Sequence, residues 1–254
     1  MFCQGDSVKR KKIPEFEILG VRIAAVNMET ALHFIMENLK LLQGQYICIS
    51  NVHTTVMSYE DASYRRIQNE AVLALPDGKP LSVVCKKRGF AEAGRVTGPD
   101  LMGEIFKQSC EQGYTHYFYG STPKTLERLK ERLEAAYRLP IAGMYAPPFR
   151  ELTEEEDRQV VEQINQAQPD FIWVGLGAPK QERWMYTHRD QVCGLMIGVG
   201  AGFDYFAGNI KRAPLWMQKC SLEWLYRFMQ DPRRLFKRYL VTNTKFLYLM
   251  VKGK

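Results

Sequence analysis

Short apolar runs alternate with amphipathic helical patterns along most of the chain, and this alternation limits the possible folds more than any other feature. The strand-like runs are YICISN (46–51), AVLALP (71–76), THYFYGS (115–121), DFIWVG (170–175) and GLMIGVG (194–200). The helical patterns lie in NMETALHFIMENLKLL (27–42), TTVMSYEDASYRRIQNE (54–70), DLMGEIFKQSCEQG (100–113) and TPKTLERLKERLEAAYRL (122–139). Such alternation predicts an α/β fold with a mainly parallel sheet flanked by helices.

Helix boundaries in this pattern carry the residues that helix ends favour. Asn27 is a plausible N-cap for the first helix, and Ser121 or Thr122 is available to cap the fourth. Pro99 suits a first helical turn, and Gly113 stands where that helix is expected to end.

Three strand-like runs end in glycine turns, at FYGS (118–121), VGLGAPKQE (174–182) and GVGAGFDYFAG (198–208). Parallel strands bring such turns and the following helix N-termini to one edge of the sheet, where phosphorylated ligands bind. Glycine also lets a helix pack tightly on a sheet, so a purely structural turn is the alternative. No G-x-x-x-x-G-K-[ST] and no clean G-x-G-x-x-G is present, which argues against an NTPase or a dehydrogenase.

Asp77 follows the apolar run 71–76 and precedes a glycine, in the stretch LPDG. Asp-Gly is a common turn former, so the residue could serve the backbone alone. It is also placed where a carboxylate at the rim of a sheet could act as a base or bind a sugar. Both interpretations stay open on the residues alone.

Charge is concentrated at the C-terminal end of the chain. Residues 211–254 hold eleven Lys and Arg against Glu223 and Asp231, a net +9, whereas the other 210 residues sum to −2. Trp, Tyr, Phe and Leu are mixed with these basic residues, which is the composition of a helix that lies on an anionic bilayer surface. A solvated basic helix packed on the domain is the simpler alternative, and nucleic-acid binding has charge alone in its favour.

Compartment and cofactors are constrained by what the sequence lacks. Six scattered cysteines without a C-x-x-C pair predict reduced thiols and a cytoplasmic location. The basic N-terminal run is followed by Pro14 and acidic residues, so no signal peptide is predicted, and no apolar run is long enough to span a bilayer. The four histidines lie far apart, so no metal site is expected. No other cofactor is expected either. His53 is a candidate to line a site.

Six ordered motifs together resemble the WecG/TagA/CpsF glycosyltransferases, bacterial enzymes of cell-surface polymer assembly. They are LPDG (75–78), RVTGPDL (95–101), FYGS (118–121), VGLGAPKQE (174–182), GVGAGFDYFAG (198–208) and RAPLWMQKCSLEWLYRFMQDPRRLFKRYL (212–240). The resemblance covers about Phe16 to Leu240. It implies a Rossmann-like fold, no bound metal, and an inverting transfer of N-acetylmannosamine or a related sugar from UDP to a polyprenyl-diphosphate-linked N-acetylglucosamine.

The resemblance also assigns roles to residues. It places Asp77 as general base and Arg95 at the leaving-group diphosphate, and both are expected to be catalytic. The expected substrate-binding residues are Asn51 near the sugar, Thr97, Gly120, the pocket glutamine Gln181, Asp204 near the uracil end, and Arg227 and Arg234 of the basic appendage. Relatives often carry Thr-x-Asn where this chain has Ile49-Ser50-Asn51, so the sugar itself is left open.

Three regions are expected: a basic N-terminal arm (1–14), an α/β catalytic domain (15–210) and a basic amphipathic C-terminal appendage (211–254). The implied partners are a UDP-sugar, a lipid-linked acceptor, the inner face of the cell membrane and a second copy of the chain, with no nucleic acid. The alternatives are a transferase that uses another UDP-hexose and a non-catalytic UDP-sugar-binding membrane scaffold.

Overall fold

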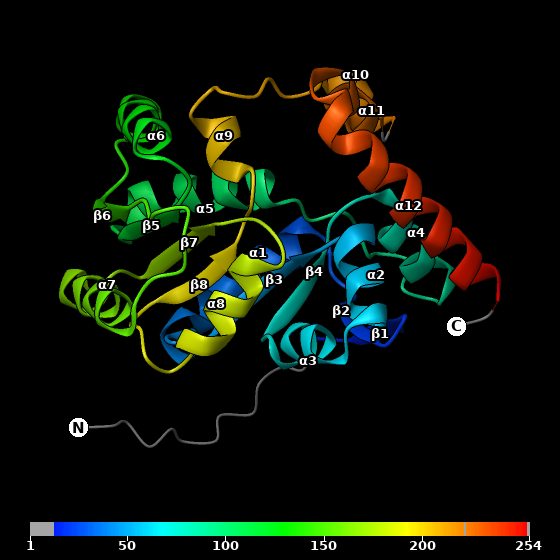
Figure 1. The fold of residues 1–254 in the computed structure, drawn as a ribbon, viewed down its shortest axis with the longest axis horizontal. Helices are drawn as coiled ribbons and strands as arrows, with labels where there is room; N and C mark the ends of the chain where they lie inside the picture. Colours follow the sequence, from blue (N-terminus) through cyan, green and yellow to red (C-terminus); the bar gives the residue numbers. More distant parts are fainter. Residues whose placement is uncertain (1–12, 221, 253–254) are drawn as a thin grey trace.

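The computed structural model describes residues 13–220 and 222–252, with the side chains of Lys219, Arg234, Lys237 and Arg238 outside that description. Its centre is a six-stranded, all-parallel sheet with the strand order β4-β3-β8-β7-β5-β6 (Figure 1). The strands are β3 (Tyr46–Ser50), β4 (Leu73–Pro76), β5 (His116–Gly120), β6 (Ile141–Tyr145), β7 (Phe171–Gly175) and β8 (Leu195–Gly198). The predicted α/β fold with a parallel sheet is confirmed.

Helices cover both faces of the sheet. One face holds α1 (Met28–Asn38), α5 (Gly98–Gln112), α6 (Pro123–Tyr137) and α9 (Gly202–Phe206), and the other holds α3 (Ala62–Glu70), α7 (Glu154–Ala167) and α8 (Lys180–His188). Successive strand residues point to opposite faces, so Phe171 and Trp173 pack among the first set of helices, and Ile172 and Val174 among the second. Both faces of the sheet are therefore buried, as expected for parallel strands.

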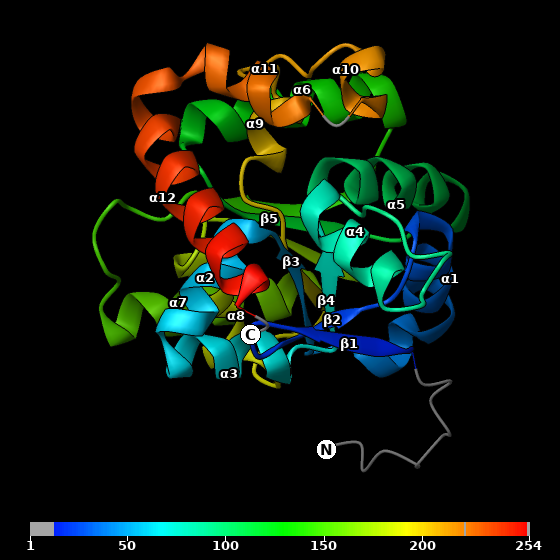
Figure 2. The same ribbon diagram turned by 90° about the vertical axis from the view of Figure 1, so that its right-hand side faces the viewer.

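A third apolar cluster holds the C-terminal part of the chain against one edge of the sheet. It joins the antiparallel hairpin β1 (Glu15–Ile18) and β2 (Val21–Ala24) with α2 (Val52–Glu60) and α4 (Lys79–Lys87). Phe246 and Leu249 of α12 (Pro232–Val251) are buried in the same cluster. The chain passes through α10 (Leu215–Lys219) and α11 (Glu223–Gln230) before it reaches α12, which lies alongside α2, as Figure 2 shows.

No helix within the described residues is long and apolar enough to cross a bilayer. The longest, α12, has 20 residues, of which five are Lys or Arg.

The predicted helix ends agree with the structure, with one correction. Asn27 and Thr122 are N-caps, and Gly113 ends α5 with φ +76°. Residues 54–70, however, are not one helix. Asp61 has an extended backbone and caps α3 by accepting from the N–H groups of Ser63 and Tyr64, so the chain breaks into α2 and α3 there.

The region between Pro140 and Asp170 forms β6 and α7, for which the apolar pattern gave no prediction. Helix α7 has a capping box between Thr153 and Glu156, a local signal that marks a helix start. The 3-10 turn Leu39–Leu42, labelled η1, extends α1. Most of the predicted N-terminal arm lies outside the described residues.

Candidate active site

Two neighbouring strands end side by side at the carboxyl edge of the sheet and bring Asn51 and Asp77 together. Ser50 of β3 is level with the last residue of β4, and the backbone N–H of Asp77 donates to the Ser50 carbonyl at 2.7 Å. Asn51 is the N-cap of α2, and its Oδ1 accepts from two N–H groups of the first turn. The Nδ2 group is therefore the part of the Asn51 side chain that is left for a ligand.

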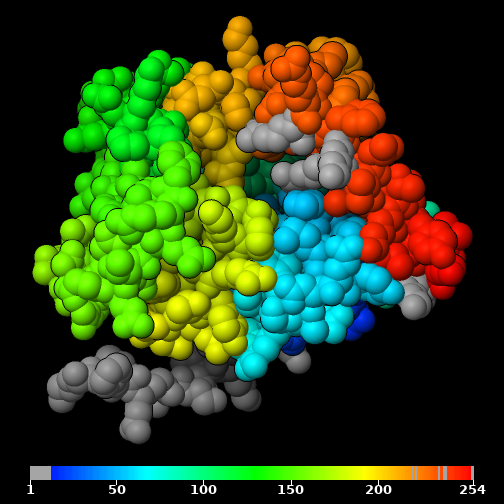
Figure 3. Space-filling view, viewed as in Figure 1, coloured from blue at the N-terminus to red at the C-terminus, as the bar shows by residue number. Residues whose placement is uncertain are grey.

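A cavity of about 550 Å³ lies at these strand ends. Figure 3 shows the hollow between the C-terminal helices above and α2 below. The α/β body contributes Asn51, Val52, His53, Asp77, Arg95, Thr97 and Tyr205 to its lining, and the C-terminal helices contribute Glu223, Trp224, Arg227, Tyr239, Phe246 and Leu247. The C-terminal helices are thus one wall of the cavity.

Asp77 is half-buried in this cavity, and burial raises the pKa of its carboxyl from 3.8 to about 6. The positive charges of Arg95 and Arg227 act to lower this pKa, and the negative charge of Glu223 acts to raise it. The next residue, Gly78, has φ +92°, a backbone conformation that residues with a Cβ atom disfavour. The result is a carboxylate that is ionised at neutral pH and more basic than a free aspartate, as a general base requires.

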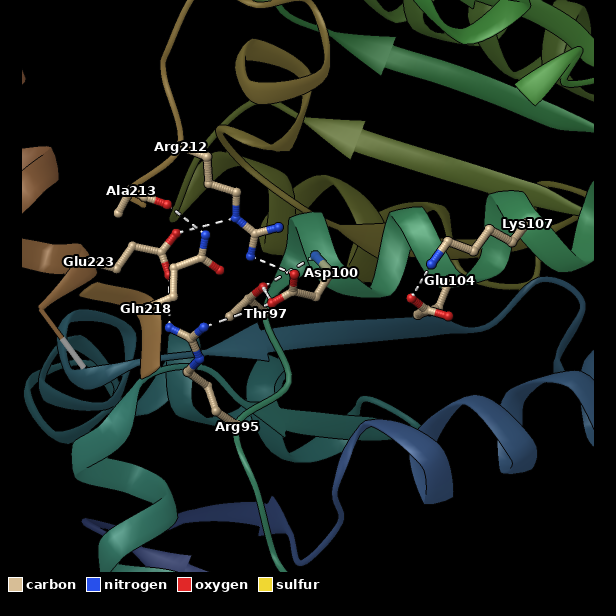
Figure 4. Close-up of polar contacts among 9 residues, drawn as sticks. All are labelled: Arg95, Thr97, Asp100, Glu104, Lys107, Arg212, Ala213, Gln218 and Glu223. Carbon is tan, nitrogen blue, oxygen red and sulfur yellow. Dashed lines mark hydrogen bonds and ion pairs between the residues drawn. The ribbon is translucent and has the colours of Figure 1, made fainter. Parts of the chain in front are cut away.

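Four charged side chains from three distant segments meet beside the cavity, as drawn in Figure 4. Arg95 donates from Nη1 to Glu223 Oε2 at 2.8 Å, and its Nη2 lies 3.9 Å from Asp100 Oδ2. Arg212 pairs with Asp100 at 2.5 Å and with Glu223 at 3.5 Å. Thr97 caps α5 and donates its hydroxyl to Asp100 at 2.7 Å. Two positive and two negative charges therefore balance one another here.

Arg227 is a second cation of the cavity, supplied by α11. Its guanidinium carbon lies 5.9 Å from the centre of the Tyr205 ring. The buried Nε of Arg227 has no hydrogen-bond partner within the part of the chain that the structure describes. An anionic group in the cavity would provide one.

The strand-end glycines are explained by close packing. A Cβ on Gly120 would lie 2.6 Å from the carbonyl carbon of Gly175, and a Cβ on Gly175 would lie 2.7 Å from the Phe203 ring. Neither glycine lines the cavity. This geometry favours the structural alternative for these turns, and a substrate contact of Gly120 stays a prediction.

Gln181 lies buried between the turns that follow β7 and β8. Its Oε1 accepts from the N–H groups of Gly177 at 3.1 Å and Gly200 at 3.0 Å, and its Nε2 donates to Glu182 at 2.8 Å. The side chain ties the two turns together and does not line the cavity. Its predicted contact with substrate stays a prediction.

Glu182 continues this hydrogen-bonded group into the protein. Its carboxyl is buried near Tyr64, and burial raises its pKa. Gln68 donates to the Tyr64 oxygen at 3.1 Å and accepts from the Ser50 hydroxyl at 2.6 Å. One set of hydrogen bonds therefore joins the end of β3 to Tyr64, and a second set joins Glu182 to the glycine turns.

The remaining predicted residues have other places. Asp204 accepts from the Asn209 amide at 3.0 Å and is the neighbour of Tyr205, but does not itself line the cavity. His53 does line it. The side chain of Arg234 lies outside the described residues. Within the described chain, no three His, Cys, Asp or Glu side chains are grouped so that they could hold a metal ion.

Glu223, Arg212 and Tyr205 were not predicted from the sequence as site residues. For Glu223 a signal existed, because it is one of only two acids among the eleven basic residues of 211–254. Its partner Arg95 is 128 residues away along the chain, so no local pattern pairs them.

The fold and the site together define an α/β enzyme with a basic carboxylate beside two arginines, an arrangement suited to transfer of a group from a phosphorylated donor. Residues 16–254 match the family described as Glycosyl transferase WecG/TagA/CpsF family. The chain belongs to that family, which confirms the resemblance of its motifs. It is therefore a glycosyltransferase, with a sugar donor and an acceptor as substrates, from a family of cell-surface polysaccharide synthesis.

Proposed function

We propose that the protein is an inverting glycosyltransferase that moves N-acetylmannosamine, or a related sugar, from a UDP-sugar to a polyprenyl-diphosphate-linked N-acetylglucosamine. The product is a precursor of teichoic acid or another cell-surface polysaccharide. One observation carries the proposal: the Asp77 carboxylate, with a pKa of about 6, lies in a cavity that Arg95 and Arg227 also line.

In the proposed step, Asp77 takes the proton of the acceptor hydroxyl while that oxygen attacks the anomeric carbon of the donor. The new glycosidic bond forms on the face opposite the diphosphate, the bond to the diphosphate breaks, and UDP leaves with its electron pair. Arg95 and Arg227 meet the charge that develops on the departing diphosphate. The proposed scheme uses no metal ion.

We also propose that the C-terminal helices bind the anionic surface of the cell membrane at its inner face. Of the twelve exposed large hydrophobic side chains in the described residues, ten lie between Leu215 and Val251. The same segment is strongly basic, and each Lys or Arg near an anionic bilayer contributes about 1 kcal/mol. Sedimentation with vesicles of anionic and of neutral lipid tests this, and equal binding to both would contradict it.

Transfer is tested with purified full-length protein, UDP-N-acetylmannosamine and a short-chain diphosphate-linked N-acetylglucosamine, in the presence of EDTA. UDP release and product mass are measured for the wild type, for Asp77→Asn and for Asp190→Asn. Asp190 is a matched control because it lies just before β3 in space, at the opposite edge of the sheet from the cavity. Its Oδ1 accepts from the Gln45 side chain, and its backbone N–H donates to the Gly44 carbonyl.

The proposal predicts an acceptor-dependent disaccharide from the wild type and from Asp190→Asn, and at least a hundredfold loss in Asp77→Asn. Unchanged activity of Asp77→Asn would remove Asp77 as the base. A folded wild type that binds UDP but forms no product with any UDP-hexose would favour the non-catalytic scaffold instead.

A further inference from the structure

Helix α11 has little apolar burial to hold it in place. It is eight residues long, none of these residues is buried, and its N-cap Leu222 makes no side-chain capping hydrogen bond. Isolated helices of this length are not stable in water, so contacts with the rest of the protein must fix it. Its first residue, Glu223, makes the ion pairs that join it to Arg95 and Arg212.

These ion pairs connect α11 to the segment that begins α5. Arg95 and Asp100 belong to that segment, and Arg212 belongs to the connection between α9 and α10 (Figure 4). Glu223 is the most enclosed of the four, with 17% of its side chain exposed, against 25–33% for the others. Removal of its charge would leave two arginines facing each other with one carboxylate between them.

Glu223 and Arg227 lie four residues apart in α11 and therefore on one face of the helix. Both line the cavity. Glu223 is held by the α/β body, whereas Arg227 lies near the Tyr205 ring and its Nε has no hydrogen-bond partner among the described residues. The orientation of α11 in which Glu223 makes its ion pairs is thus the one in which Arg227 lines the cavity.

We propose that Glu223 is a positioning residue that docks α11 on the α/β body through Arg95 and Arg212 and thereby places Arg227 for an anionic ligand. The nature of that ligand, a nucleoside diphosphate, rests on the proposed function. Arg95 can bind Glu223 and the ligand at the same time. Its Nη1 donates to Glu223, whereas its Nη2 lies 3.9 Å from Asp100, which is too far for a hydrogen bond, so the N–H groups of Nη2 are left for the ligand.

A different role for the same carboxylate has the opposite consequence. If Glu223 occupied the ligand's place on Arg95, its neutralisation would strengthen the binding of anions. If it docks α11, its neutralisation weakens that binding, because Arg227 is no longer held at the cavity. The sign of the change in affinity separates the two roles.

Docking is measured without any ligand by the rate of tryptic cleavage within residues 211–233, in the wild type, Glu223→Gln and Glu104→Gln. Glu104 is the matched control, since it is an ion-paired glutamate of α5 that bonds Lys107 away from the cavity. We expect cleavage to be at least threefold faster in Glu223→Gln and unchanged in Glu104→Gln. Equal rates in all three proteins would overturn the proposal.

Ligand placement is measured by calorimetry with UDP. We expect Glu223→Gln to weaken UDP binding about tenfold, Glu223→Asp to recover part of that loss, and the donor KM to rise with the dissociation constant. The double variant Glu223→Gln/Arg227→Gln should bind no more than twofold weaker than Arg227→Gln, because the first change acts through the second.

Tighter binding of UDP by Glu223→Gln, or independent losses that multiply in the double variant, would overturn the positioning role. A wild type that does not bind UDP would contradict the proposed function alone, since the proteolysis measurement tests docking without it.

Discussion

Neutralisation of Asp77 should stabilise the protein at neutral pH while it abolishes transfer. An acid whose pKa is higher in the folded state binds its proton more tightly there, so its ionisation lowers the free energy of unfolding. For Asp77 the pKa rises from 3.8 to about 6, chiefly because partial burial disfavours the charged carboxylate. Asparagine has nearly the same shape and carries no charge, so Asp77→Asn removes this cost.

The gain in the free energy of unfolding of Asp77→Asn should depend on pH, because it arises from the ionisation of Asp77. Two pKa units correspond to about 3 kcal/mol, which is the expected gain of Asp77→Asn at pH 7 and an upper limit, since the residue keeps some exposure. The gain should fall to about half at pH 5 and to a small fraction at pH 4, where the folded wild type holds its proton.

Urea unfolding of the wild type and Asp77→Asn, followed by circular dichroism between pH 4 and pH 8, measures this difference directly. Effects of pH on all other groups cancel between the two proteins. A variant that is equally stable or less stable at pH 7, or a gain that does not shrink towards pH 4, would refute the reasoning.

Three further predictions concern the same region. The initial transfer rate of the wild type should fall as pH drops below about 6, because Asp77 then loses its ionised form, and a pH-rate profile checks this. Glu182→Gln should change the free energy of unfolding by less than about 1 kcal/mol, since burial disfavours the charged carboxylate and glutamine keeps the shape of the side chain, whereas Glu182→Ala should cost about 2–4 kcal/mol; urea unfolding compares them. Gly175→Ala should lower stability by about 1–3 kcal/mol, measured in the same way, because its Cβ would meet the Phe203 ring.

The elements of the fold that depend on local sequence were predictable. Alternation of apolar runs and helical stripes predicted five of the six strands of the parallel sheet and the helices α1, α5 and α6, and the caps at Asn27 and Thr122 marked the starts of α1 and α6. Asp61 was missed as a break because the apolar pattern continues across it, while its side chain caps the next helix. The order of the strands in the sheet is set by long-range packing, which no local pattern records.

The candidate site divides in the same way. Asp77 was identifiable because a carboxylate directly after a buried strand lies at the sheet edge, and its neighbour Asn51 follows from the pairing of β3 with β4. Glu223 was not, because its role depends on a contact with Arg95 across 128 residues. Gln181 was expected to meet substrate, which stays a prediction, and its hydrogen bonds to two turns are revealed only by the three-dimensional arrangement of the strand ends.

Because the C-terminal helices form one wall of the cavity, the basicity of Asp77 depends on their docking. Burial is the largest cause of the raised pKa of Asp77, and the negative charge of Glu223 acts in the same direction. Glu223→Gln removes that charge, and release of α11 would admit water to the carboxylate, so both effects lower the pKa of Asp77 towards 3.8. Loss of the positive charge of Arg227 acts in the opposite direction but is smaller than either of these effects.

The midpoint of the pH-rate profile should therefore move below 6 in Glu223→Gln and stay in place in Glu104→Gln. An unchanged midpoint in Glu223→Gln would mean that the α/β body alone buries Asp77. A shifted midpoint would mean that Glu223, through its charge and through docking of α11, sets part of the working pKa of the base, which ties catalysis to the part of the chain that we propose meets the membrane.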